Sequence, residues 1–208
     1  MRRALRRNLM VLGLLCAGWS PVPCAAYSDD AVKAAFLYRF TGYVDWPPSS
    51  LQGGEFTVAV LESRPVAREL SRLLARYPVK KLPGRVRMVD EAAQATGAQV
   101  LYVGQGYRGD LQDIARTLAA QPVLLVTDRP GALDEGSIVN FLVVDRRVRF
   151  EVSLGAAHQA GLKVSSQLLA VAARVRGAVM PWPVRPCPQS FPPTNSFDRS
   201  CRLRVASL

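Results

Sequence analysis

Short apolar runs that alternate with helical patterns are the feature that most restricts the fold of this chain. The runs are rich in β-branched or apolar residues, each is bounded by Gly, Pro or Asp, and they cover residues 56–61, 85–89, 100–103 and 123–127. Helical patterns lie between them at residues 65–76, which begin with Pro65, and at residues 110–120, with Asp110 as the expected N-cap. Strands that alternate with helices predict an α/β fold, with a mostly parallel central sheet covered by helices on both faces.

The pattern changes after residue 137. Two strand-like runs, residues 138–144 and 148–153, are separated only by residues 145–147, which predicts a C-terminal antiparallel hairpin at one side of the sheet. The second run alternates apolar with polar residues, as a half-buried strand does: Val148, Phe150 and Val152 against Arg149, Glu151 and Ser153. Both strands are expected to belong to the same single domain.

The N-terminal 26 residues differ in composition from this α/β part. Four arginines precede an apolar run of eleven residues, 9–19, about half the roughly twenty residues that span a bilayer. This order is typical of a secretory signal peptide, here with cleavage after Ala26 and Tyr27 as the first mature residue. We therefore expect a soluble protein exported to the periplasm, with residues 27–177 as its folded domain.

The C-terminal end of the folded part is predicted from a change of pattern as well. Ser165 or Ser166 is expected to cap a last helix that continues to Arg174. Residues 178–208 contain six prolines between positions 181 and 193 and show no apolar periodicity, so we expect a disordered tail. Cys187 and Cys201, the two cysteines that export would retain, can form a disulfide within that tail.

An aromatic-rich stretch lies near the predicted mature N-terminus. Residues 36–46 contain five of the chain's sixteen aromatic residues, and a helix over residues 29–42 would be apolar around most of its circumference. Such a helix must be covered on more than one side, by the sheet and by a second subunit or another protein. We expect Phe36 and Phe40 to lie in the core, and Tyr38, Tyr43 and Trp46 to be candidates for an exposed partner or dimer interface.

Charge and residue counts disfavour several functional classes. The formal net charge of +11 at pH 7 falls to +7 without residues 1–26, which carry four arginines and no acid, and no basic–aromatic run indicates nucleic-acid binding. His158 is the only histidine, which excludes a multi-histidine metal site and leaves it as the single base for a Ser-His-Asp arrangement. No nucleophile pattern lies near His158. The sequence therefore predicts neither an enzyme nor a cofactor or metal site.

A glycine motif follows the third strand-like run. Gly104, Gly106 and Gly109 match the GxGxxG spacing of dinucleotide-binding turns, and Asp128 lies about twenty residues further on. However, Asp110 places the expected helix start after the third glycine, and exported proteins seldom meet NAD. We interpret the motif as a structural turn.

Three segments resemble the YfiR-like family of exported bacterial proteins: AVKAAFLYRFTGYVDWP, QVLYVG and GSIVNFLVVDRRVRFEVSLGAAHQAGLKVSSQLLAVA. The resemblance covers residues 31–176, and its last block is the most specific, with an INF-type strand, an RFE-type strand and a GLK-x-SS-x-LL helix start in fixed order. It implies a periplasmic, non-enzymatic α/β protein that is commonly dimeric.

The resemblance also implies a role in cyclic di-GMP signalling and biofilm formation. The best-known member restrains a membrane diguanylate cyclase by binding its periplasmic sensor region, and an outer-membrane lipoprotein relieves the restraint. Other members are associated with other membrane sensors. The present chain has no cysteine between Tyr27 and Met180, so the disulfides of that member are not carried over.

Two functional classes follow. In the first, the chain is a regulatory binding module that inhibits such a cyclase or sensor through its aromatic helix and its final hairpin, where Arg149 and Glu151 are further interface candidates. In the second, it is a periplasmic small-molecule binder linked to a transporter, a TonB-dependent receptor or a sensor kinase. A ligand would then lie at the loops after the strands, residues 104–109 and 128–136, where open α/β sheets place ligands.

Overall fold

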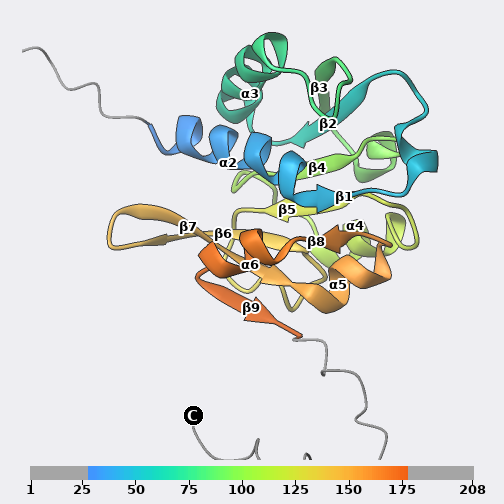
Figure 1. Cartoon of the computed structure of the whole chain (residues 1–208). Helices are drawn as coiled ribbons and strands as arrows, with labels where there is room; N and C mark the ends of the chain where they lie inside the picture. The colour runs from blue at the N-terminus through green and yellow to red at the C-terminus, as the bar shows by residue number, and fades with distance from the viewer. Residues whose placement is uncertain (1–27, 178–208) are drawn as a thin grey trace, which may run out of the picture. The chain divides into compact units, whose positions relative to one another are not determined.

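The computed structural model describes residues 28–177 and confirms the α/β fold (Figure 1). The signal peptide, the tail and the bridge between Cys187 and Cys201 were predicted from residues outside this range. Within the described range, no helix combines the length and the apolar character that crossing a membrane requires.

A seven-stranded sheet forms the centre of the fold, in the order β3-β2-β4-β5-β6-β7-β9. The first five of these strands are parallel, β7 is antiparallel to β6, and β9 is parallel to β7. In sheet order the strands are β3 (Gly84–Val89), β2 (Phe56–Leu61), β4 (Val100–Val103), β5 (Leu124–Thr127), β6 (Val139–Val144), β7 (Arg147–Ser153) and β9 (Arg174–Arg176). After β2, the chain forms β3 on one side of β2 and then β4 on the other side. The strand order therefore reverses between β2 and β4.

Helices cover both faces of this sheet. Helix α3 (Arg64–Arg76) connects β2 to β3 and α4 (Leu111–Thr117) connects β4 to β5. Because right-handed crossovers that progress in opposite directions lie on opposite faces, α3 and α4 are on different sides. Helix α2 (Asp29–Tyr43) packs against α3 and also contacts β7 and α6 (Ser166–Val171). The remaining elements are short: β1 (Val44–Asp45), η1 (Pro48–Leu51), η2 (Ala92–Ala95), α5 (Leu154–Gln159) and β8 (Lys163–Val164).

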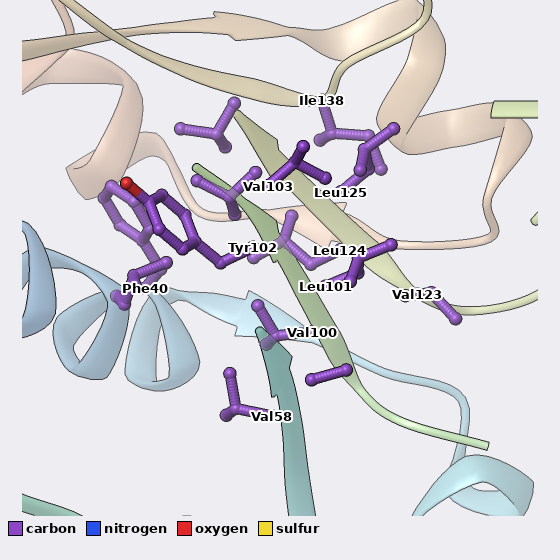
Figure 2. Close-up of a cluster of buried hydrophobic side chains, with 14 of the residues drawn as sticks. Phe40, Val58, Val100, Leu101, Tyr102, Val103, Val123, Leu124, Leu125 and Ile138 are labelled. Carbon is purple, nitrogen blue, oxygen red and sulfur yellow. The ribbon is translucent and has the colours of Figure 1, made fainter. Parts of the chain in front are cut away.

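An aromatic cluster seats α2 on the sheet. Phe40 is fully buried, and its ring centroid lies 5.0 Å from that of Phe150 and 5.8 Å from that of Phe141. Phe36 joins the same cluster, 5.5 Å from Phe150. Figure 2 shows Phe40 beside Tyr102 of β4, next to aliphatic side chains of β4 and β5. The prediction of a core position is confirmed for Phe40, and Phe36 is partly buried and packs against the core.

The hairpin turn is tighter than the three residues expected. Asp145 and Arg146 have φ of 50° and 59°, the left-handed pair of a two-residue type I′ turn, and Arg147 already belongs to β7. The predicted alternation holds for Arg149, which is exposed, but not for Glu151 or Ser153, which are buried. Glu151 is covered because a further strand, β9, pairs with this part of β7.

Strand β9 corrects the prediction of a helix that continues to Arg174. Helix α6 ends at Val171, Ala172 is extended, and the Ala173 N–H donates to the Phe150 carbonyl at 2.8 Å. Arg174 then pairs in register with Glu151. At the end of the strand, the Arg176 guanidinium hydrogen-bonds Asp134 and lowers the pKa of that carboxyl below its ordinary value.

Ending the chain after Ala172 should lower the free energy of unfolding by about 2–4 kcal/mol, because roughly three backbone hydrogen bonds at 0.5–1.5 kcal/mol each are lost. Ending it after Gly177 keeps β9 and should leave the melting temperature nearly unchanged. Urea unfolding of the two truncated chains measures the difference, and equal stability would show that β9 contributes nothing to the domain.

Candidate functional site

A cavity of about 530 Å³ lies where the strand order reverses, at the carboxyl ends of the parallel strands. Its lining combines the β2–α3 loop, the loop after β4, the end of β3 and the start of α2. Open α/β sheets place ligands at this point, because the loops on either side diverge and leave a crevice. The loop at residues 104–109, named above for the small-molecule class, contributes Gln105 and Gly106 to the lining.

A buried ion pair forms the floor of this cavity. Lys33 lies on α2 and Asp128 directly follows β5. Lys33 Nζ is 2.6 Å from Asp128 Oδ2, and the two side chains are 8% and 5% exposed. Tyr102 O–H donates to the same Asp128 oxygen at 3.2 Å, and Gln105 Nε2 donates to Oδ1 at 3.1 Å. Since burial removes the hydration of both charges, these additional donors are what make a carboxylate tolerable there.

Tyr102 is held in its neutral form. Burial, and then the nearby carboxylate of Asp128, raise the pKa of Tyr102 far above its ordinary value. The phenol therefore remains a hydrogen-bond donor throughout the physiological range. Within the described residues, Lys33 Nζ makes one hydrogen bond, to Asp128, although an ammonium group carries three N–H donors.

The glycine motif shapes this cavity by close packing. A Cβ at Gly104 would lie 2.5 Å from the Glu62 carbonyl oxygen, so only glycine lets the loop after β4 approach the β2–α3 loop. The backbone of Glu62 has a φ of 57°, a left-handed conformation that is uncommon for residues other than glycine. Helix α4 begins after the third glycine, and the Asp110 carboxylate accepts from Gln112 N–H, where a pyrophosphate would otherwise bind. These features support the interpretation as a structural turn.

The aromatic interface candidates have different environments. Tyr38 and Tyr43 are both partly buried, and the Tyr38 ring lies 6.1 Å from that of Tyr77 after α3. Trp46, by contrast, is only 6% exposed, which corrects the expectation of an exposed ring. Its indole N–H donates to the Gln99 carbonyl at 3.0 Å and its ring packs edge-on against Phe56, so it anchors the chain before β2.

The two interface candidates on the hairpin also differ in exposure. Arg149 is exposed, whereas Glu151 accepts from the Asn140 amide at 3.0 Å and lies 3.9 Å from Arg174. Asn140 and Glu151 are direct cross-strand partners, and Thr127 O–H donates to the side-chain Oδ1 of Asn140 at 2.9 Å. The asparagine of the INF-type strand and the glutamate of the RFE-type strand therefore hydrogen-bond to each other inside the fold. His158 lies exposed on α5, away from this network.

The five interface candidates contact different elements, so the structure does not gather them into one site. The buried pair of Lys33 and Asp128 was not recognised as a site from the sequence. Lys33 is a rare polar residue in the middle of an otherwise apolar helix, which is the signal that could have indicated a buried partner.

A family model described as YfiR/HmsC-like matches residues 30–173, from the first turn of α2 to the residue before β9. The chain belongs to this family. The YfiR-like family is a periplasmic, regulatory and non-catalytic family whose members generally interact with a membrane diguanylate cyclase sensor. The match covers the cavity and the aromatic cluster as well as the hairpin.

Replacing one partner of the ion pair should lower the free energy of unfolding more than replacing both partners. Asp128→Ala leaves the Lys33 charge buried without its partner and should lower the free energy of unfolding by about 3–5 kcal/mol. The double variant Lys33→Met/Asp128→Leu should recover most of that loss, because it leaves no buried charge. Urea denaturation of the single and double variants tests this, and losses that simply add would contradict it.

Tyr102→Phe should lower the free energy of unfolding by about 1.5–3 kcal/mol near pH 7, the contribution of one hydrogen bond to a charged acceptor. Unfolded tyrosine loses its proton near pH 10, while folded Tyr102 keeps it, so the wild-type protein loses stability as pH rises above about 10. The variant has no phenol at this position and lacks that part of the pH dependence. The stability gap should therefore shrink between pH 9 and pH 11 in denaturant titrations, and a constant gap would refute the assignment.

Proposed function

We propose that the protein is a non-enzymatic periplasmic regulator that binds the periplasmic sensor region of a membrane signalling enzyme, a diguanylate cyclase, and inhibits it, lowering cyclic di-GMP. The observation that carries this proposal is the family match over residues 30–173. A homodimer as the active form, and release by an outer-membrane lipoprotein, belong to the same proposal.

The tip of the β6–β7 hairpin supports binding to a protein partner. It projects beyond the neighbouring strands (Figure 1), and Val143 and Val144 are 55% and 45% exposed. The turn between the strands adds the exposed Arg146, and β7 adds the exposed Arg147 and Arg149. Exposed apolar side chains beside arginines are characteristic of protein interfaces.

The cavity at the strand-order reversal favours a second candidate function, binding of a small polar ligand. Its lining includes the unburied carboxylate of Glu62 and the guanidinium of Arg64 in addition to the buried ion pair. Such a lining suits a molecule that carries both hydrogen-bond donors and acceptors. The two functions are compatible, because α2 contributes both Lys33 to the cavity and Tyr38 to the surface around Tyr77.

Deleting the gene should raise cellular cyclic di-GMP and surface attachment, because the partner cyclase loses its inhibitor. The full chain supplied in trans should restore the low level, whereas a form without residues 1–26 should not, since it would remain in the cytoplasm. Cyclic di-GMP quantification by mass spectrometry measures the effect. An unchanged level, together with tight small-molecule binding by the purified protein, would replace this function with the ligand-binding one.

A further inference from the structure

Helices α2 and α3 pack against each other and leave a groove of about 460 Å³ between them, which we call the α2–α3 groove. Figure 1 shows the two helices as neighbours. The groove is floored by apolar side chains from both helices and from the residue after α3: Ala31, Val32, Ala35, Phe36, Leu73 and Tyr77. Its floor is therefore apolar although it lies open to solvent.

This apolar surface is not part of the main core contact of α3. The buried residues of α3 are Val66, Ala67, Leu70 and Leu74, which form its sheet-facing side. Leu73 is only partly buried, and Tyr77 remains 47% exposed. A partner that covered these side chains would gain roughly 25 cal/mol for each Å² of apolar area removed from water.

Four exposed arginines lie along α3 at intervals of four residues: Arg64, Arg68, Arg72 and Arg76. Like charges at this spacing repel each other by roughly 0.2–0.5 kcal/mol per pair. In the part of the chain that the structure describes, the one ion pair in this row joins Arg72 to Glu69, at 2.7 Å. The row therefore retains a positive charge that the fold itself does not neutralise.

The charge flanks the groove on both sides. Arg72 and Arg76 line it from α3, and Arg39 lines it from α2. Glu69 of α3 also lines the groove and pairs with Arg72, so Arg39 and Arg76 are the lining arginines that form no ion pair among the described residues. An arginine guanidinium binds carboxylates with two parallel hydrogen bonds, so each rim presents directed donors to an acidic occupant. A helix laid between two helices can fill such a groove, with apolar residues on the floor and acidic residues against the rims.

We propose that the α2–α3 groove binds an amphipathic, acidic helix from the sensor region of the partner enzyme. This inference rests on the proposed function and names the surface through which it would act. Helix α3 has 13 residues and is thus about 20 Å long, which matches an occupant of three to four turns. Tyr38 and Tyr77, whose rings contact each other, would close one end of the groove.

Other occupants fit the groove less well. In a symmetric pairing of two copies through this surface, arginine rims would face arginine rims. The tail beyond residue 177 carries Arg185, Arg199, Arg202 and Arg204 against Asp198, so it has the same sign of charge as the rims. An anionic bilayer would reach the arginines, but the apolar floor is recessed between the helices, whereas surfaces that insert into membranes present their apolar residues outward.

The test measures the affinity of the full chain, after export, for the purified periplasmic sensor region of the cyclase. Arg39→Glu/Arg76→Glu reverses one charge on each rim and should raise Kd at least about tenfold, and it should weaken the salt dependence of binding. The matched control Arg85→Glu/Arg108→Glu changes the net charge equally at exposed positions outside both the groove and the hairpin tip, and it should leave Kd within about threefold.

A second pair of variants fills the groove without changing charge. Ala35→Trp places a ring on the exposed part of the floor and should weaken binding similarly, whereas Ala93→Trp makes the same change at an exposed residue of η2 and should not. Circular dichroism and thermal unfolding confirm that each variant is folded. Sensor binding by the wild type that is unchanged in both groove variants would overturn the groove proposal and leave the proposed function standing.

An independent probe keeps the inference testable if the sensor region does not bind, a result that would count against the proposed function. The probe is a stapled helical peptide of about four turns, with leucines on one face and glutamates on both flanks. Binding that is lost in Arg39→Glu/Arg76→Glu supports the groove, and no binding by the wild type overturns it. Binding to phosphatidylglycerol vesicles lost in the same variant, or a dimer that the variant dissociates, would also overturn it in favour of a membrane or a second copy.

Discussion

The ion pair between Lys33 and Asp128 joins α2 to the carboxyl end of the sheet, and the position of α2 determines two of the candidate binding surfaces, the cavity and the α2–α3 groove. Two charges that are almost fully buried tolerate little displacement, because each loses its partner if the helix moves. The aromatic contacts of Phe36 and Phe40 with Phe150 hold the middle of the same helix. Together these interactions fix α2 at one edge of the cavity and against α3.

One face of α2 lines the cavity with Lys33, and another lines the α2–α3 groove with Ala35 and Arg39. A ligand that contacted the ion pair would therefore act on the helix that a partner is proposed to contact. If binding at one surface changes affinity at the other, the coupling must be equal in both directions. If both proposals hold, a small ligand in the cavity regulates partner binding without touching the interface.

Several conspicuous sequence motifs have structural roles. Asn140 and Glu151, from the two most specific strand motifs, hydrogen-bond across β6 and β7. Gly104 allows two loops to meet beside the cavity. In this chain these motif residues make contacts inside the fold, so they do not by themselves mark its binding surfaces.

The sequence by itself determined the elements that depend on local pattern. Strands β2 and β4 have the predicted bounds, and the Asp110 and Ser165 caps are present, because apolar periodicity and capping act over a few residues. Tertiary structure decided the rest. Strand β9 is three exposed residues that extend only because β7 offers a pairing edge. The Trp46 indole N–H donates to a carbonyl 53 positions away, and Lys33 pairs with a carboxylate 95 positions away. Contacts over such separations form only when the whole sheet has assembled, so no local pattern encodes them.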